Sequence, residues 1–483
     1  MGLNDANAEL LNAIAKVVGS TGLRQPGPDD LHEPRGLFRG RAAAVIRPAN
    51  TAELSAVMKL CHAALVGVVP LGGGTGLTGG RTLEQGPIPV LLSLEKMSAI
   101  RSLDSAANTL VAEAGAILQN VQTAAAAQDR LFPLSLASQG SAQIGGVLST
   151  NAGGVNVLRY GNARNLCLGL EVVLADGRIW HGLKGLHKDN TGYDLRDLMI
   201  GAEGTLGIIT AAVLRLYPRP AQHCAAWIAV PDPATALELY TTLSAELGGT
   251  ISAFELIDQT GLDFLRETGV MTPPADLPVS PWSVLLDCSA GPGSDLAERV
   301  ELVLGRAFEL DLCSDALISQ NQAQRDVFWQ IREAIPAANR RIGAVSSHDI
   351  ALPLAAIPNF IAKARAAIDP QLRLNCFGHL GDGNLHFNFF PPKGAKRSDF
   401  AQNAPLVQRM VYDLVAEMGG SFSAEHGIGR LKLNELQRYS DPVKLQMMRA
   451  IKSALDPRGI LNPGALIPPE NLANTAPPDN RTP

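Results

Sequence analysis

The sequence predicts an α+β fold with two main domains. Its 483 residues exceed the length at which a single hydrophobic core usually stops growing. Helix and strand patterns alternate along the chain, and their arrangement changes at the proline-containing segment 217–220. The expected parts are an N-terminal helical segment over 1–40, a first domain over 41–219, a second domain over 220–455, a C-terminal segment over 456–467 and a disordered tail over 468–483.

Local patterns place the elements of the first domain. Residues 7–18 form an amphipathic pattern, and Thr51 is expected to cap a helix over 52–65. The dipeptide Asp176-Gly177 is a strong turn signal between two strand patterns. The expected strands are 43–46, 66–71, 90–92, 168–174, 178–180 and 208–216.

The second domain has a different pattern. Helical segments at 234–247, 294–308 and 357–368 alternate with shorter apolar strands. This alternation favours an α+β domain built on an antiparallel sheet. Four prolines within 271–281 predict a loop, and the expected strands are 227–230, 282–287, 372–378 and 385–390.

Composition excludes several classes of protein. With 41 basic and 46 acidic residues the net charge is −5, which gives no reason to expect a nucleic-acid partner. The longest uncharged run, 131–158, contains too many polar residues for a transmembrane helix. Six scattered cysteines without a Cys-x-x-Cys pair argue against a disulfide scaffold, and the N-terminus shows no secretory signal, so we expect a cytoplasmic protein.

Three glycine-rich clusters need a functional explanation. The first, 72–80, follows a strand; the second, 138–154, lies in the uncharged run; the third, 201–207, enters a strand. Consecutive glycines let backbone N–H groups turn towards an anion, and neutral donors suit a large uncharged ring with a pyrophosphate. A flexible turn would explain the first cluster alone, but not three clusters in one domain.

These clusters resemble the FAD-binding domain of the vanillyl-alcohol oxidase/p-cresol methylhydroxylase flavoproteins. The resemblance implies bound FAD. Some members attach the flavin covalently through a histidine of the first loop; here that position is Thr75, so we expect non-covalent FAD. The cofactor-binding residues implied are Pro70, Gly72, Gly73, Gly74, Thr75, Gly76, Leu77, Thr78, Ser138, Gly145, Gly146, Asn151, Gly153, Gly154, Glu203, Gly204, Ile209 and Asn462.

Two histidine motifs mark the second half of the chain. In the segment 378–388, His386 and Asn388 share one strand face, and a turn at Asp382-Gly383 can bring His379 back towards His386. The second motif, 423–429, carries a Glu-His pair. Two histidines and a glutamate suit a divalent metal ion. Core histidines with satisfied hydrogen bonds are the alternative, which suits one isolated histidine better than these paired motifs.

The motifs are similar to the C-terminal domain of FAD-linked oxidases that act on D-2-hydroxy acids, and the resemblance covers roughly 40–467. It includes the C-terminal segment 456–467, which in that family returns to the flavin. It implies that Arg332 binds the C1 carboxylate, that Asn388 orients the substrate, and that His426 is the general base. It also implies a divalent ion, with zinc as the expected metal, on His379, His386 and Glu425. The substrate would lose a hydride to the flavin and become a 2-oxo acid, and a protein, a quinone or a similar acceptor would receive the electrons. A homodimer stays open.

Two departures concern substrate choice. Where the hydroxyglutarate branch of the family has a lysine and a threonine, this chain has Ser347 and Pro336. The difference favours lactate-like acids without excluding hydroxyglutarate, and it leaves open whether His348 compensates. Three alternatives stay open: a flavin oxidase of another alcohol class, a metal-dependent hydrolase, and a partner-dependent subunit of a multi-chain glycolate-oxidase-type complex.

Overall fold

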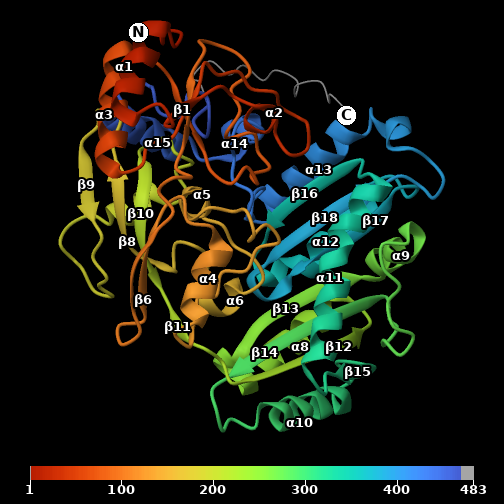
Figure 1. The fold of residues 1–483 in the computed structure, drawn as a ribbon. Coiled ribbons are helices and arrows are strands. Elements are labelled where there is room, and N and C mark those ends of the chain that lie inside the picture. The colour runs from red at the N-terminus through yellow and green to blue at the C-terminus, as the bar shows by residue number, and fades with distance from the viewer. Residues whose placement is uncertain (1, 469–483) are drawn as a thin grey trace. The chain divides into compact units, whose positions relative to one another are not determined.

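The computed structural model describes residues 2–468, which form two compact units (Figure 1). Unit 1 contains the described residues of 2–154, 161–219 and 425–468, and unit 2 contains 155–160 and 220–424. Residues 425–455, which we expected with the second domain, therefore have their contacts in unit 1. The tail that we expected to be disordered lies, from residue 469 onwards, outside the described residues.

Unit 1 contains two main sheets. In the first, β2, β4 and β3 are parallel neighbours, and β1 joins β2 in the antiparallel direction. The second sheet is antiparallel, in the order β5-β6-β10-β8-β9, and a small pair joins β7 to β11. The strands are β1 (Leu23–Arg24), β2 (Val45–Ile46), β3 (Val68–Leu71), β4 (Val90–Ser93), β5 (Ile100–Asp104), β6 (Thr109–Glu113), β7 (Arg130–Leu131), β8 (Cys167–Val173), β9 (Ile179–Gly182), β10 (Ile208–Arg215) and β11 (Tyr217–Pro218).

The expected N-cap of helix α3 (Thr51–Ala64) was wrong by one residue. Asn50, not Thr51, is the N-cap of α3, because the extended Asn50 accepts a 2.9 Å hydrogen bond from the Glu53 backbone N–H. Thr51 already lies in the helix and donates its hydroxyl to Glu171. The helices are α1 (Ala8–Val18), α2 (Pro28–Leu31), α3 (Thr51–Ala64), α4 (Leu118–Ala126), α5 (Ile144–Ser149), α7 (Leu195–Met199), α14 (Leu433–Tyr439) and α15 (Pro442–Leu455).

Unit 2 is built on a seven-stranded sheet in the order β15-β12-β14-β13-β17-β18-β16. Every neighbouring pair is antiparallel, which confirms the expected α+β class with an antiparallel sheet. The strands are β12 (Gln222–Val230), β13 (Ile251–Asp258), β14 (Trp282–Ala290), β15 (Asp315–Ile318), β16 (Ser346–Ala351), β17 (Arg373–His379) and β18 (Asn384–Phe390).

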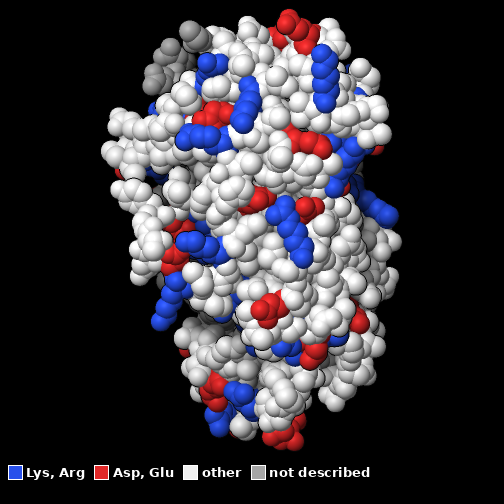
Figure 2. Space-filling view, turned by 60° about the vertical axis from the view of Figure 1, so that its left-hand side comes forward, with Lys and Arg blue, Asp and Glu red and all other residues white. Residues whose placement is uncertain are grey.

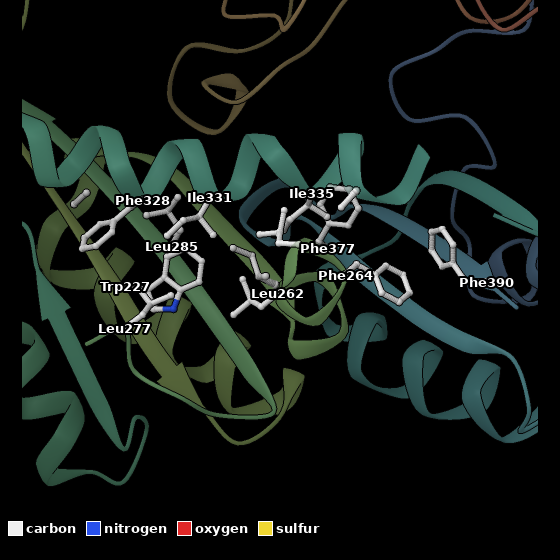
Figure 3. Packing of buried hydrophobic residues seen from close by; sticks show 14 residues of the cluster. Trp227, Leu262, Phe264, Leu277, Leu285, Phe328, Ile331, Ile335, Phe377 and Phe390 are labelled. Carbon is white, nitrogen blue, oxygen red and sulfur yellow. The ribbon is translucent and has the colours of Figure 1, made fainter. Parts of the chain in front are cut away.

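Helices cover both faces of this sheet. On one face, Phe328, Ile331 and Ile335 of α11 pack over Trp227 and Phe377 (Figure 3). On the other face, α8 and α12 place aromatic rings about 5 Å from rings of β13 and β18. The helices are α6 (Val157–Tyr160), α8 (Pro233–Leu247), α9 (Gln259–Thr268), α10 (Leu296–Glu309), α11 (Gln322–Ile342), α12 (Ile357–Ala367) and α13 (Ala404–Glu417), with short 3₁₀ turns η1 (Gly248–Thr250), η2 (Leu354–Ala356), η3 (Leu380–Asp382) and η4 (Arg397–Phe400).

The surface carries charges of both signs. Figure 2 shows acidic and basic side chains interspersed over the visible face, in agreement with the small net charge of −5. None of the helices in the described part of the chain is long and apolar enough to cross a membrane. All six cysteines are free and buried.

Candidate active site

A cavity in unit 1 brings the three glycine clusters together. The first cluster leaves the end of β3, the second includes α5, and the third leads into β10. The cavity has a volume of about 190 Å³. The expected cofactor residues that line it are Pro70, Gly72, Gly73, Gly74, Thr75, Gly76, Thr78, Gly145, Gly146, Glu203, Gly204, Ile209 and Asn462. The structure does not place Leu77, Ser138, Asn151, Gly153 or Gly154 on its wall.

Close backbone contacts explain why glycine recurs around this cavity. A Cβ atom on Gly73 would lie 1.9 Å from the carbonyl oxygen of Ser141, so only glycine lets the first cluster pack against the second. Gly429 has φ +54°, and a Cβ there would lie 2.1 Å from the Thr78 carbonyl oxygen. The clusters are therefore walls of one cradle and not independent flexible turns.

Arg81 also lines the cavity and was not identified from the sequence. Its terminal amino groups donate to the backbone carbonyls of Asp29 and His32, while its buried Nε has no hydrogen-bond partner within residues 2–468. A half-buried cation with an unused buried donor fits an anionic group such as the pyrophosphate of FAD. No local motif marks Arg81, because its position depends on the N-terminal segment around 29–32.

Glu203 connects the cavity to the loop that contains the Glu-His motif. Its carboxylate accepts hydrogen bonds of 2.8 Å from the backbone N–H groups of Ile428 and Gly429. Burial raises the pKa of Glu203, and these hydrogen bonds act in the opposite direction. The side chain of Asn462 donates to the Glu203 backbone carbonyl at 2.8 Å. Glu203 thus lines the cavity and also supports the loop beside it.

Arg430, also missed from the sequence, ties the same loop to two other walls. It donates to the carbonyls of Gly79 and Gly80 at 2.9 and 2.6 Å, and to Asn462 and Pro463 at 2.9 and 2.8 Å. Burial lowers the pKa of Arg430 to about 10. The consequence is that His426, four residues earlier, lines the cavity on a well-supported loop. It is the one histidine on the cavity wall among the described residues.

Glu425, which precedes His426, is the first residue of the C-terminal part of unit 1. One of its carboxylate oxygens accepts a 3.1 Å hydrogen bond from the Gly154 backbone N–H. Gly154, expected to contact the cofactor, is therefore used to hold this glutamate.

In unit 2, the expected hairpin brings two histidines together. Strands β17 and β18 are joined by η3 and Gly383, which has φ +87° and no room for a Cβ beside the Leu352 carbonyl oxygen. The rings of His379 and His386 lie with their centroids 5.8 Å apart. The prediction that the turn returns His379 towards His386 is confirmed.

Glu255 of β13 contacts His379 of this pair and was not identified from the sequence. Its two carboxylate oxygens accept from His379 Nδ1 at 2.5 Å and from Arg332 Nε at 2.8 Å. The side chain of Glu255 is fully buried. Burial by itself would raise the pKa of Glu255, but its electrostatic interactions and hydrogen bonds with His379 and Arg332 hold it at about 2.

Arg332 lies on α11 and is almost entirely buried, with 6% of its surface exposed. Its guanidinium carbon lies 5.0 Å from the centre of the Phe377 ring. Neither terminal amino nitrogen forms a hydrogen bond with another described residue, so both stay available to a ligand. Pro336 follows in the helix and lacks the N–H that would bond the Arg332 carbonyl.

The positions of Asn388 and His348 show whether His348 can replace the lysine that is absent at position 347. Asn388 faces the same side of the sheet as His386, and its amide oxygen accepts a 3.1 Å hydrogen bond from the His348 backbone. The His348 ring faces the opposite side, where it contacts the Phe387 carbonyl and the Ser346 hydroxyl. His348 therefore does not replace the lysine, and the exposed Ser347 lies opposite Asn388 in the β-ladder.

Comparison with known families identifies the chain. Residues 219–466 match the family described as FAD linked oxidases, C-terminal domain, and residues 42–182 match the FAD binding domain family. The chain belongs to the FAD-linked oxidases. This FAD-linked oxidase is thus an oxidoreductase whose cofactor is FAD, as the glycine clusters predicted. Family membership also argues against the metal-dependent hydrolase considered above.

Curated relatives match nearly the whole chain. Mitochondrial D-2-hydroxyglutarate dehydrogenase of Bos taurus is 36% identical, over 91% of this chain and 80% of its own length. The D-2-hydroxyglutarate dehydrogenase of Xanthomonas citri pv. viticola is 35% identical, over 88% and 89%. A D-2-hydroxyglutarate–pyruvate transhydrogenase of Saccharomyces cerevisiae is 33% identical, over 88% and 86%. Because some relatives are named as mitochondrial, a cytoplasmic location stays a prediction.

Solved structures agree on the fold. p-Cresol methylhydroxylase with bound substrate superposes with a TM-score of 0.75 at 16% identity, over 96% of this chain and 98% of that one. The 4-ethylphenol oxidase of Gulosibacter chungangensis gives 0.73 at 19% identity, over 98% and 100%. The expected p-cresol-methylhydroxylase-type FAD domain is therefore confirmed.

Proposed function

We propose that this FAD-linked oxidase oxidises a D-2-hydroxy acid to the corresponding 2-oxo acid. The observation that carries the proposal is the buried Arg332, whose Nε is held by Glu255 and whose terminal amino groups have no partner among the described residues. The names of the curated relatives, which act on D-2-hydroxyglutarate, support the same substrate class.

Arg332 would bind the C1 carboxylate of the substrate. A planar guanidinium can donate two parallel hydrogen bonds to a carboxylate, which fixes the orientation of the acid as well as its position. The amide nitrogen of Asn388 is proposed to orient the substrate, since the amide oxygen is already used by the His348 backbone.

His426 is proposed to take the proton of the C2 hydroxyl. A ring nitrogen of an imidazole can accept a proton, which is the chemistry that a general base needs. The location of His426 on the wall of the flavin cavity supports this role. FAD, when bound, accepts the hydride that leaves C2.

We further propose that His379, His386 and Glu425 bind a divalent ion, most consistent with zinc. Two imidazoles and a carboxylate are a common set of zinc ligands. The close approach of the two histidine rings supports the choice. A bound ion of this kind lowers the pKa of a hydroxyl that it contacts.

The flavin is proposed to be held without a covalent bond. Thr75 lines the cavity at the position where some flavoproteins of this fold carry the attaching histidine. Acid precipitation should therefore release all yellow colour into the supernatant. Colour that stays with the washed pellet would show covalent attachment.

Two observations bear on which D-2-hydroxy acid is the substrate, and they favour different acids. The relatives favour D-2-hydroxyglutarate, whereas Ser347 in place of a lysine favours an acid without a second carboxylate, such as D-lactate. Electrons are proposed to leave to another protein, a quinone or a similar acceptor.

Steady-state assays with a dye as electron acceptor test the proposal. The panel contains the D- and L-forms of lactate, 2-hydroxyglutarate and longer 2-hydroxy acids, and the 2-oxo product is measured directly. We expect oxidation of at least one D-acid and of none of the L-acids. A protein with full FAD content that oxidises no D-acid would contradict the proposal.

A further inference from the structure

One buried carboxylate in unit 2 serves two functional side chains. The Oε1 atom of Glu255 accepts from His379 and its Oε2 atom accepts from Arg332, and the partners come from β17 and α11. Glu255 lies 77 residues before Arg332 and 124 residues before His379. No solvent reaches the side chain. Each oxygen is therefore assigned to one donor.

We propose that Glu255 is a positioning residue that prepares His379 for a metal ion and Arg332 for the substrate carboxylate. The inference rests on the proposed function and adds a residue that the sequence motifs do not include. On the histidine side, an ionised carboxylate can only accept hydrogen bonds, so Nδ1 of His379 carries the proton. The other ring nitrogen, Nε2, then keeps its lone pair for a divalent cation, as in carboxylate–histidine–metal arrangements.

On the arginine side, the hydrogen bond to Nε fixes one edge of the guanidinium. Phe377 packs against the guanidinium at 5.0 Å and against the His386 ring at 5.0 Å. Because Nε is occupied, the two terminal amino groups are left to form the paired hydrogen bonds that a carboxylate accepts. The buried Glu255 side chain thus sets the orientation of both His379 and Arg332.

The contacts of Asp287 provide a comparison, because they join the sheet to α11 without involving the proposed site. Asp287 of β14 accepts from Arg325 of α11 at 3.0 and 2.5 Å and from the Trp329 indole at 2.9 Å. These contacts also join the sheet to α11 through a buried carboxylate, but among the described residues none of the hydrogen bonds of the Asp287 side chain involves a histidine. Asp287→Asn is therefore a matched control for Glu255→Gln.

The substitution Glu255→Gln replaces one of the two accepting oxygens by a donating nitrogen. The amide has one accepting oxygen and one donating nitrogen, so it can serve only one of the two donors. If its nitrogen faces His379, the ring proton must move to Nε2, the atom proposed to bind the ion. If its nitrogen faces Arg332, two donors oppose each other and the guanidinium must turn.

The test uses the FAD-containing protein after removal of metal. Zinc alone is titrated into wild type, E255Q and D287N in competition with a chromophoric chelator, and KM and kcat are measured after reconstitution. We expect E255Q to bind zinc about 10- to 100-fold more weakly and to show a raised KM, while D287N keeps the zinc affinity and KM of wild type even if it is less stable. Wild-type zinc affinity and KM in E255Q would overturn the inference, as would equal losses in D287N.

A measurement on the unmodified protein keeps the inference testable if E255Q does not fold. Nitrogen-15 NMR of histidine-labelled wild type, with the His379 signals assigned from a His379→Ala variant, reports which ring nitrogen carries the proton. We expect the proton on Nδ1, and a proton on Nε2 would overturn the inference. If wild type binds no zinc or oxidises no D-2-hydroxy acid, the proposed function fails, yet the tautomer of His379 still decides the role of Glu255.

Discussion

Glu203 and Ile428 are joined by a 2.8 Å hydrogen bond across 225 residues of sequence. The Glu203 carboxylate is the acceptor, and its second oxygen accepts from the next residue, Gly429, so that two consecutive N–H groups of the loop are held. Both ends of this connection lie in unit 1 beside the cavity that the glycine clusters line. The loop that contains His426 is therefore supported by the same segment that lines this cavity.

Replacing Glu203 by Gln should loosen this loop. The amide keeps one accepting oxygen, so one buried N–H loses its partner, at a cost of about 1–3 kcal/mol. We expect weaker FAD binding and a lower kcat, measured by flavin fluorescence on dilution and by steady-state turnover. Glu171→Gln is the control, because Glu171 is a buried carboxylate of unit 1 that bonds to Thr51 and Thr210 and does not line the cavity. Equal FAD affinity in E203Q and wild type would contradict the role given to this contact.

His426→Asn should impair the chemical step. Loss of a general base typically lowers kcat by about 10²–10⁴-fold. Bound FAD should be retained, because many other residues line the cavity. His181→Asn serves as a control, since the His181 side chain is 72% exposed. A kcat for H426N close to that of wild type would remove His426 as the base.

Arg332→Lys should weaken substrate binding. A lysine is a single-point donor and cannot bond to Glu255 and also grip a carboxylate with two parallel hydrogen bonds. A charge-assisted hydrogen bond contributes about 1.5–3 kcal/mol, so kcat/KM should fall by about 10- to 150-fold. Arg325→Lys, two turns earlier on α11, should leave KM unchanged because Arg325 bonds to Asp287. Unchanged kcat/KM in R332K would show that the substrate carboxylate binds elsewhere.

The six buried cysteines should be unreactive in the folded protein. Burial raises the pKa of Cys61 and of Cys167 to about 12, and that of Cys224 to about 11. A raised pKa means that these thiols stay protonated at pH 7–9, where an ordinary thiol with a pKa near 8.5 ionises. A thiol reagent should thus titrate none in the native protein at pH 8, and all six after denaturation. Rapid native reaction, above all at the facing pair Cys224 and Cys288, would contradict this account.

The sequence predicted the parts of the site that have a local signature. The glycine clusters could be recognised because close backbone packing, as at Gly73 against Ser141, leaves no alternative to glycine. The hairpin with His379 and His386 could be recognised because its turn and its alternating strand lie within eleven residues.

The residues that were missed depend on pairing between distant segments. Glu255 lies in an apolar strand without a motif, and its meaning comes from the register that places it opposite His379. Arg81 is held by backbone carbonyls of the N-terminal segment, and Arg430 by carbonyls of two separate loops. His348 could not be assigned from the sequence, because only the register of β16 against β18, which pairs His348 with Phe387, shows that it faces away from His386.

Anaerobic mixing of the purified protein with a D-2-hydroxy acid tests the central claim most directly. The absorbance of the bound flavin is followed in zinc-containing protein, in protein freed of metal by EDTA, and after zinc is restored. We predict that the D-acid bleaches the flavin while the L-acid does not, that metal-free protein keeps its FAD but is not bleached, and that zinc restores the reaction. Equal bleaching in verified metal-free protein, or by the L-acid, would contradict the claim.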